Sequence, residues 1–143
     1  MYDKHHKQML YPDELHNSGV FLDAFGRPFQ LKRHWFSVTI AYLTGCVVMH
    51  QTPHRTAKGE QLWEGDICDF DIPNNFGSFT ACRGLMGWDR GLQKWNISIT
   101  APEQSMFVDG FHVGLINLRR VGDLYTTPDI LKTTPYASKD TAK

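Results

Sequence analysis

Four carboxylates in the middle of the chain are the first candidates for chemistry: Glu64, Asp66, Asp69 and Asp71. Such a group could bind a metal ion or act in acid and base catalysis. From Ile67 to Ile72, however, apolar and acidic residues alternate, which is typical of a strand with one face in water. No further acidic residue follows at the spacing of a known metal motif. We therefore predict turn caps and a solvated strand face, with no metal and no cofactor.

Histidines give a second possible metal pair. His50 and His54 are four residues apart, the spacing of two ligands on one helical face. Pro53 lies between them and opposes such a helix. We predict surface histidines here.

Catalytic motifs are lacking in the sequence. It contains no Gly-x-Ser-x-Gly elbow, no phosphate-binding glycine loop and no metalloprotease helix motif, although residue types alone leave Cys-His-Asn catalysis open. The three cysteines, Cys46, Cys68 and Cys82, form no C-x-x-C pair, and buried free thiols are the simplest interpretation. We predict that the protein is not an enzyme and has no catalytic residues.

Charge is balanced, with 15 Lys and Arg residues against 15 Asp and Glu. The chain therefore lacks the positive field that attracts nucleic acid, and its weak repulsion favours self-association. A local basic and aromatic patch remains an alternative, built from Arg119, Arg120 and the run Lys32 to Trp35. The other aromatic residues at strand positions are more simply explained as core residues: Trp63, Trp88, Trp95 and Tyr125.

Short strands punctuated by glycine and proline must position these groups. Residues 20–23 and 28–31 flank a turn at Gly26 and predict a hairpin, whereas Trp35 to Leu43 is either strand or helix. A loop is expected over residues 51–59. Further strands are expected over residues 67–72, 79–88, 94–100, 105–109 and 111–118, and a short helix with Thr127 as N-cap and Pro128 at its first position. The predicted class is mainly β (a β-rich α+β fold), an N-terminal hairpin packed on a small SH3-like or β-barrel body with a short C-terminal helix.

Two sequence motifs resemble those of a known family. Gly59 to Ile67 ends in Glu64-Gly65-Asp66-Ile67, in which the glycine permits a sharp turn and the carboxylates can accept backbone N–H bonds across it. Val121 to Leu131 combines a Gly-Asp-aliphatic-Tyr strand end with a Pro-acidic-aliphatic-Leu helix start. Together with Tyr2 to Leu10 and Gly87-Trp88-Asp89, the chain resembles the YopX-like family of phage and prophage proteins over residues 2–131.

The resemblance implies one YopX-like domain over residues 1–143, divided into a hairpin region 1–34, a barrel-like body 35–131 and a tail 132–143. It also implies a largely β protein that forms oligomers in the cytoplasm of a bacterial host. The resemblance assigns no catalytic residue. The sequence shows no apolar stretch long enough to span a membrane and no leader.

The chain departs from the family pattern at Thr52 to Thr56, and its segment from Ile72 to Thr80 looks extended. Variable loops on a constant scaffold are where binding specificity usually lies. We therefore expect a non-enzymatic protein that binds a host or phage protein, such as a defence nuclease of a CRISPR or restriction system. A nucleic-acid-binding small barrel and a structural homo-oligomer are the alternatives. The candidate binding residues are Asp69, Asp71, Asn74, Asn75, His54, Arg55, Arg119 and Arg120.

Overall fold

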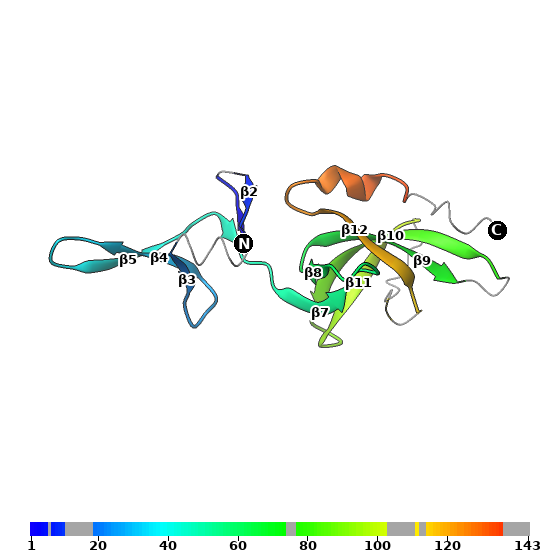
Figure 1. The fold of residues 1–143 in the computed structure, drawn as a ribbon, viewed down its shortest axis with the longest axis horizontal. Helices are drawn as coiled ribbons and strands as arrows, with labels where there is room; N and C mark the ends of the chain where they lie inside the picture. The colour runs from blue at the N-terminus through cyan, green and yellow to red at the C-terminus, as the bar shows by residue number, and fades with distance from the viewer. Residues whose placement is uncertain (6, 11–18, 74–76, 103–110, 112–113, 136–143) are drawn as a thin grey trace. The chain divides into compact units, whose positions relative to one another are not determined.

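The computed structural model (Figure 1) describes residues 1–5, 7–10, 19–73, 77–102, 111 and 114–135. The protein is mainly β, with 55% strand and four antiparallel sheets, so the predicted class is confirmed at this level. The chain forms two compact units, residues 1–49 and 50–143. The single YopX-like domain over residues 1–143 stays a prediction.

The first unit contains two small sheets. Strands β1 (Tyr2–Asp3), β2 (Gln8–Met9) and β6 (Cys46–Val47) pair in the order β2-β1-β6. Strands β3 (Val20–Leu22), β4 (Pro28–Arg33) and β5 (Val38–Tyr42) pair in the order β3-β4-β5. The hairpin turn at Gly26, whose φ is 75°, is confirmed. The open choice for residues 35–43 is settled as strand, since Val38 to Tyr42 pairs with β4.

The second unit contains a hairpin and a four-stranded sheet. The hairpin is β7 (Gln51–Arg55) with β8 (Gln61–Trp63), and the sheet has the order β11-β10-β9-β12. Its strands are β9 (Asp66–Pro73), β10 (Phe79–Asp89), β11 (Lys94–Ala101) and β12 (Ile116–Asp123). The buried hydrophobic core comprises Leu62, Cys68, Phe70, Cys82, Met86, Ile97 and Leu118.

Two expected boundaries differ from the observed ones. Residues 51–55 form a strand rather than a loop, because a shift in the β7–β8 register accommodates Pro53. The last sheet strand begins at Ile116, whereas Phe111 lies in a turn. The strand expected over 105–109 lies outside the described residues. Within the part of the chain that the structure describes, the sheets do not close into a barrel.

The Glu64-Gly65-Asp66 turn has the predicted geometry. Gly65 has a φ of 87°, in the left-handed region that favours glycine. Asp66 accepts a hydrogen bond from the backbone N–H of Trp63 at 2.8 Å, and Ile67 is fully buried. The Gly65 N–H donates to the Met86 carbonyl, and the Gly65 carbonyl accepts from the Leu124 N–H. One turn therefore joins three strands of the second unit.

The C-terminal helix is a single 3₁₀ turn, η1 (Pro128–Lys132), with Thr127 at its N-cap position and Pro128 inside its first turn. The predicted N-cap position of Thr127 is confirmed, although its side chain makes no capping hydrogen bond. Its hydroxyl instead accepts the Asp123 N–H at 3.0 Å and donates to the Asp123 carbonyl at 3.2 Å. No helix within the described residues has the length and apolarity to span a membrane.

Candidate functional site

Asp69 and Asp71 are buried, so the interpretation of a solvated strand face is wrong. Their exposed fractions are 1% and 5%. Strand β9 is an inner strand, and its neighbours β10 and β12 each supply a polar partner to one of the two carboxylates. Asp71 accepts a hydrogen bond from the Asn117 side chain at 2.8 Å. Neither carboxylate is presented to a binding partner in this conformation.

Asp69 forms a two-pronged ion pair with Arg83, which lies directly opposite it on β10. The Arg83 Nε and Nη2 atoms donate to the two Asp69 oxygens at 2.6 and 2.9 Å. The remaining Arg83 nitrogen, Nη1, donates to the Ile130 and Thr133 carbonyls at 2.7 and 3.1 Å, and also to the Thr133 hydroxyl. Arg83 is 2% exposed. This ion pair therefore fastens η1 to the sheet and is structural.

A second charged group surrounds the turn after β12. Arg120 donates to Asp66 at 2.7 Å and to Asp123 at 3.3 Å. Burial raises the pKa of the Asp66 carboxyl above its ordinary value, although the Arg120 and Trp63 hydrogen bonds act in the opposite direction. Arg120 is thus committed largely to neighbouring carboxylates.

The other predicted binding residues are dispersed. His54 stacks on Phe111 with ring centroids 3.8 Å apart, and Arg55 donates to the Gly59 carbonyl at 2.9 Å. Arg119 is 39% exposed in its side chain, 3.8 Å from Asp69, and lines a cavity of about 490 Å³ together with Lys58 and Arg120. Asn74 and Asn75 lie outside the described residues. No group of three or more His, Cys, Asp or Glu side chains that could hold a metal is present among the described residues.

A continuous apolar face on the β3-β4-β5 sheet was missed at the sequence level. In an antiparallel sheet, residues directly opposite each other share a face. The register pairs Phe21 with Phe29, Phe29 with Tyr42, Leu31 with Ile40, and Arg33 with Val38. We call the apolar members of this set the apolar face: Phe21, Phe29, Leu31, Val38, Ile40 and Tyr42. The opposite face of the β4–β5 pair carries Gln30, Lys32, Thr39 and Ala41.

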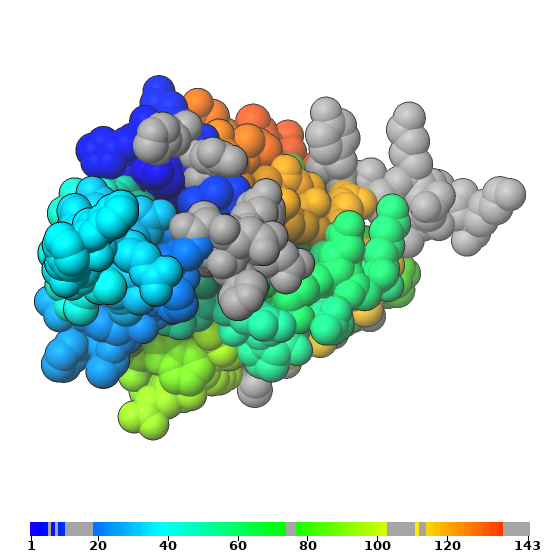
Figure 2. Space-filling model, turned by 60° about the vertical axis from the view of Figure 1, so that its left-hand side comes forward, coloured from blue at the N-terminus to red at the C-terminus, as the bar shows by residue number. Residues whose placement is uncertain are grey.

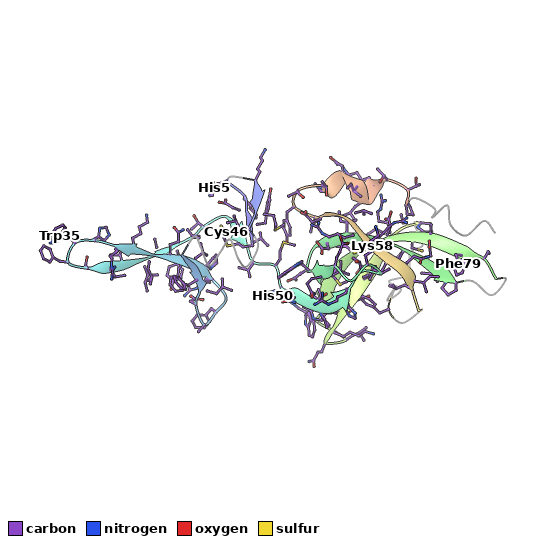
Figure 3. All side chains as sticks on the ribbon, viewed as in Figure 1. His5, Trp35, Cys46, His50, Lys58 and Phe79 are labelled. Atoms are coloured by element: carbon purple, nitrogen blue, oxygen red, sulfur yellow. The ribbon has the colours of Figure 1, made fainter. Side chains whose placement is uncertain are left out.

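Much of the apolar face is open to water. Phe21, Leu31 and Tyr42 are 47–50% exposed, and Val38 and Ile40 are 57% and 58% exposed. The loop between β4 and β5 adds Trp35 and Phe36, which are 91% and 94% exposed. Figure 3 shows Trp35 at this loop, and Figure 2 shows the cyan residues of β4 and β5 at the molecular surface. Apolar patches of this kind usually mark interaction sites.

The first unit has little core of its own. Its buried hydrophobic residues, among those described, are Met1, Tyr2 and Met49, and Pro28 is the one buried residue of the β3-β4-β5 sheet. A three-stranded sheet gains stability by packing a hydrophobic face against another element. The apolar face of this sheet is therefore unfinished within the first unit.

Cation–π contacts mark one edge of the same face. The Arg27 guanidinium lies 4.7 Å from the Tyr42 ring centroid and 5.4 Å from that of Phe25. Asp23 holds Arg27 in place through a 2.7 Å hydrogen bond and also accepts the backbone N–H groups of Phe25 and Arg27. The β3–β4 turn is thus ordered by its own side chains.

Comparison with known proteins gives no match: no family model, no curated protein and no solved structure matches this chain. The YopX-like resemblance therefore stays a prediction.

Proposed function

We propose that the chain is a non-enzymatic binding protein that acts through protein–protein contact, with the apolar face and the Trp35–Phe36 loop as its contact surface. The observation that carries the proposal is the register of β3, β4 and β5, which collects six apolar residues on one exposed face. Aromatic residues are enriched at protein interfaces because they bury large areas.

The first occupant we propose is a second copy of the chain. With about 150–250 Å² for a fully exposed aromatic side chain, the face and the loop together expose on the order of 800 Å², the area that each partner contributes to a standard interface. Because the 15 Lys and Arg residues balance the 15 Asp and Glu residues, net charge does not oppose contact between two copies. Two sheets packed face to face would complete a two-layer sandwich around a shared core.

The YopX-like resemblance supports a second proposed partner class, a host or phage protein met in the bacterial cytoplasm, such as a defence nuclease. The same resemblance supports the finer architecture, an N-terminal hairpin packed on an SH3-like barrel. The consecutive strands β7 to β11 would form an SH3-like body that stays open, since the described sheets do not close into a barrel.

The test measures mass in solution by light scattering and sedimentation equilibrium. The wild type should behave as a dimer of the 16.4 kDa chain. Ile40→Lys places a charge inside the proposed interface and should yield a folded monomer. Thr39→Lys is the matched control, because it adds the same charge to the opposite face of the same strand, and it should remain a dimer.

A monomeric wild type at about 100 μM, a concentration above ordinary specific affinities, would exclude the second copy. Pull-down from a bacterial lysate, with nuclease treatment, then tests the wider proposal. A protein partner captured by the wild type and by Thr39→Lys, yet lost by Ile40→Lys, would support contact through the apolar face. A wild type that neither dimerises nor captures any protein would refute it.

Nucleic-acid binding is a second candidate, favoured by the cavity that Lys58, Arg119 and Arg120 line. Phosphate contacts make affinity fall steeply with salt. Arg119→Ala with Lys58→Ala should then weaken binding to DNA and flatten its salt dependence. Dimerisation should not change.

A further inference from the structure

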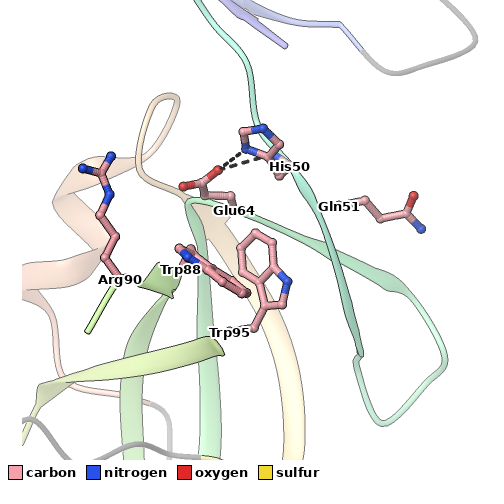
Figure 4. A pocket seen from close by; sticks show the side chains of 6 residues that line it. All are labelled: His50, Gln51, Glu64, Trp88, Arg90 and Trp95. Carbon is pink, nitrogen blue, oxygen red and sulfur yellow. Dashed lines mark hydrogen bonds and ion pairs between the residues drawn. The ribbon is translucent and has the colours of Figure 1, made fainter. Parts of the chain in front are cut away.

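A second surface cavity lies in the second unit, at the end of the β10–β11 hairpin (Figure 4). Its volume is about 450 Å³, within the usual range for small-molecule sites. The lining residues are His50, Gln51, Glu64, Trp88, Arg90 and Trp95. They come from the start of β7, the β8–β9 turn and the β10–β11 hairpin. All of them belong to residues 50–143.

Two tryptophans form the floor of this cavity. Trp88 and Trp95 lie directly opposite each other in the β10–β11 register, and their rings make an edge-to-face contact with centroids 5.4 Å apart. Trp88 is 46% exposed, so the prediction that it is a core residue is wrong. An indole held in place and open to water offers a flat surface on which another ring can stack.

An acceptor lies at the rim. The Glu64 oxygen Oε2 accepts a hydrogen bond from His50 Nδ1 at 2.7 Å, which fixes the carboxylate beside the indole rings. The structure records no hydrogen bond to the other oxygen, Oε1, within the described residues. Because a carboxylate is an acceptor only, this position suits a ligand edge rich in N–H donors.

A cation lies at the same rim. Arg90 follows Trp88 by two residues, is exposed, and has no ion pair among the described residues. Arg90 lines the same cavity as Glu64, and Figure 4 shows its side chain at the edge of the group, apart from the His50–Glu64 pair. A guanidinium in this position can bind a phosphate through two parallel hydrogen bonds.

We propose that this cavity binds a guanine nucleotide, either free or within a single strand of nucleic acid. The base stacks on Trp88, its N1–H and N2–H groups donate to Glu64, and its phosphate is held by Arg90. Each contact uses a different chemical feature of the ligand, and a guanine nucleotide offers all three.

Other ligand classes fit less well. Arg90 opposes a simple cation on the tryptophan rings, and Glu64 opposes a simple anion. Adenine presents one donor group and an acceptor nitrogen on its pairing edge, so it leaves the carboxylate poorly matched. The acceptor oxygen of Glu64 therefore selects guanine over adenine.

Intrinsic tryptophan fluorescence and calorimetry test the proposal with GMP, AMP, guanosine and a single-stranded tetranucleotide containing one guanine. Saturable binding of GMP with a preference of about tenfold over AMP is expected, as for one well-matched base contact. Guanosine should bind more weakly than GMP because it lacks the phosphate. Tighter binding of the tetranucleotide than of GMP would identify the strand as the source; equal binding would identify the free nucleotide.

Three variants separate the contacts. Trp88→Ala should weaken GMP binding about tenfold through lost stacking. Glu64→Gln should remove the preference for GMP over AMP, and Arg90→Ala should remove the difference between GMP and guanosine. Trp35→Ala is the control, since Trp35 is an exposed tryptophan of the other unit, and it should bind GMP like the wild type.

The proposal is overturned if neither GMP nor the tetranucleotide binds saturably below about 1 mM, the affinity range of the weakest specific ligands. Equal affinity for GMP and AMP would also overturn it, as would binding that Trp88→Ala and Glu64→Gln leave unchanged. The outcome is independent of the proposed dimer, because Ile40→Lys should retain GMP binding.

Discussion

Loss of the Arg83 side chain should destabilise the second unit strongly. Asp69 is 1% exposed, and the variant Arg83→Met would remove both of its short hydrogen bonds. The next cation, Arg119 Nη2, lies 3.8 Å from Asp69. Removing one partner of a buried ion pair costs about 3–5 kcal/mol, because the remaining charge is desolvated and unpaired. The lost bonds to the Ile130 and Thr133 carbonyls add about 1 kcal/mol each.

Urea denaturation and thermal melting give the measurement. A loss of about 5–7 kcal/mol corresponds to a fall in Tm of roughly 15 °C or more for a chain of this size. The double variant Asp69→Leu with Arg83→Met removes both charges and should regain much of the loss, since an apolar pair avoids the desolvation cost. The reasoning is refuted if Arg83→Met costs less than about 1 kcal/mol, the range of an exposed pair, or if the double variant is as unstable as the two single losses added together.

Three further predictions concern the turn, the thiols and pH. Gly65→Ala should lower the free energy of unfolding, measured in urea, by about 1–2 kcal/mol because φ is 87° at this position. Gly87→Ala is the control and should cost less, since the space around its Cβ position is open. Equal losses in the two variants would contradict the turn argument. Burial raises the pKa of the Cys68 thiol to about 12. A thiol reagent at about pH 8 should therefore modify the half-buried Cys46 first and should modify Cys68 only in denaturant. Rapid labelling of Cys68 in the native protein would show that the core opens. Burial also raises the pKa of Asp66 above its unfolded value of 3.8, so its stabilising contribution is present below that pH and is lost as pH rises through the raised pKa. The free energy of unfolding of the wild type, taken relative to Asp66→Asn, should therefore fall as pH rises above about 3.8. A rise over the same range would contradict the argument.

Local signals in the sequence predicted the elements that depend on neighbouring residues. Gly26 and Gly65 needed only their own conformational freedom to make the predicted turns, and the alternation from Trp95 to Thr100 lies within the observed strand β11. The three cysteines are free, as predicted, with Cys68 and Cys82 buried.

Contacts between distant residues could not be predicted in the same way. The alternation of β9 suggested a wet acidic face, but the cation that covers Asp69 lies on the next strand, 14 residues away. Alternation shows that two faces differ; it does not show that one of them is wet. The apolar face depends on a register between β4 and β5, although the alternate apolar residues Val38, Ile40 and Tyr42 were a usable signal.

Every strand pairing of the described residues lies on one side or the other of the peptide bond between Met49 and His50. Scission at that bond would break no β-ladder, and the core from Leu62 to Leu118 would stay on one fragment. We therefore expect residues 50–143 to fold as a separate polypeptide that carries the tryptophan cavity without the apolar face. A heat-capacity scan of the whole protein should then show two transitions, and only the one from the first unit should shift with protein concentration.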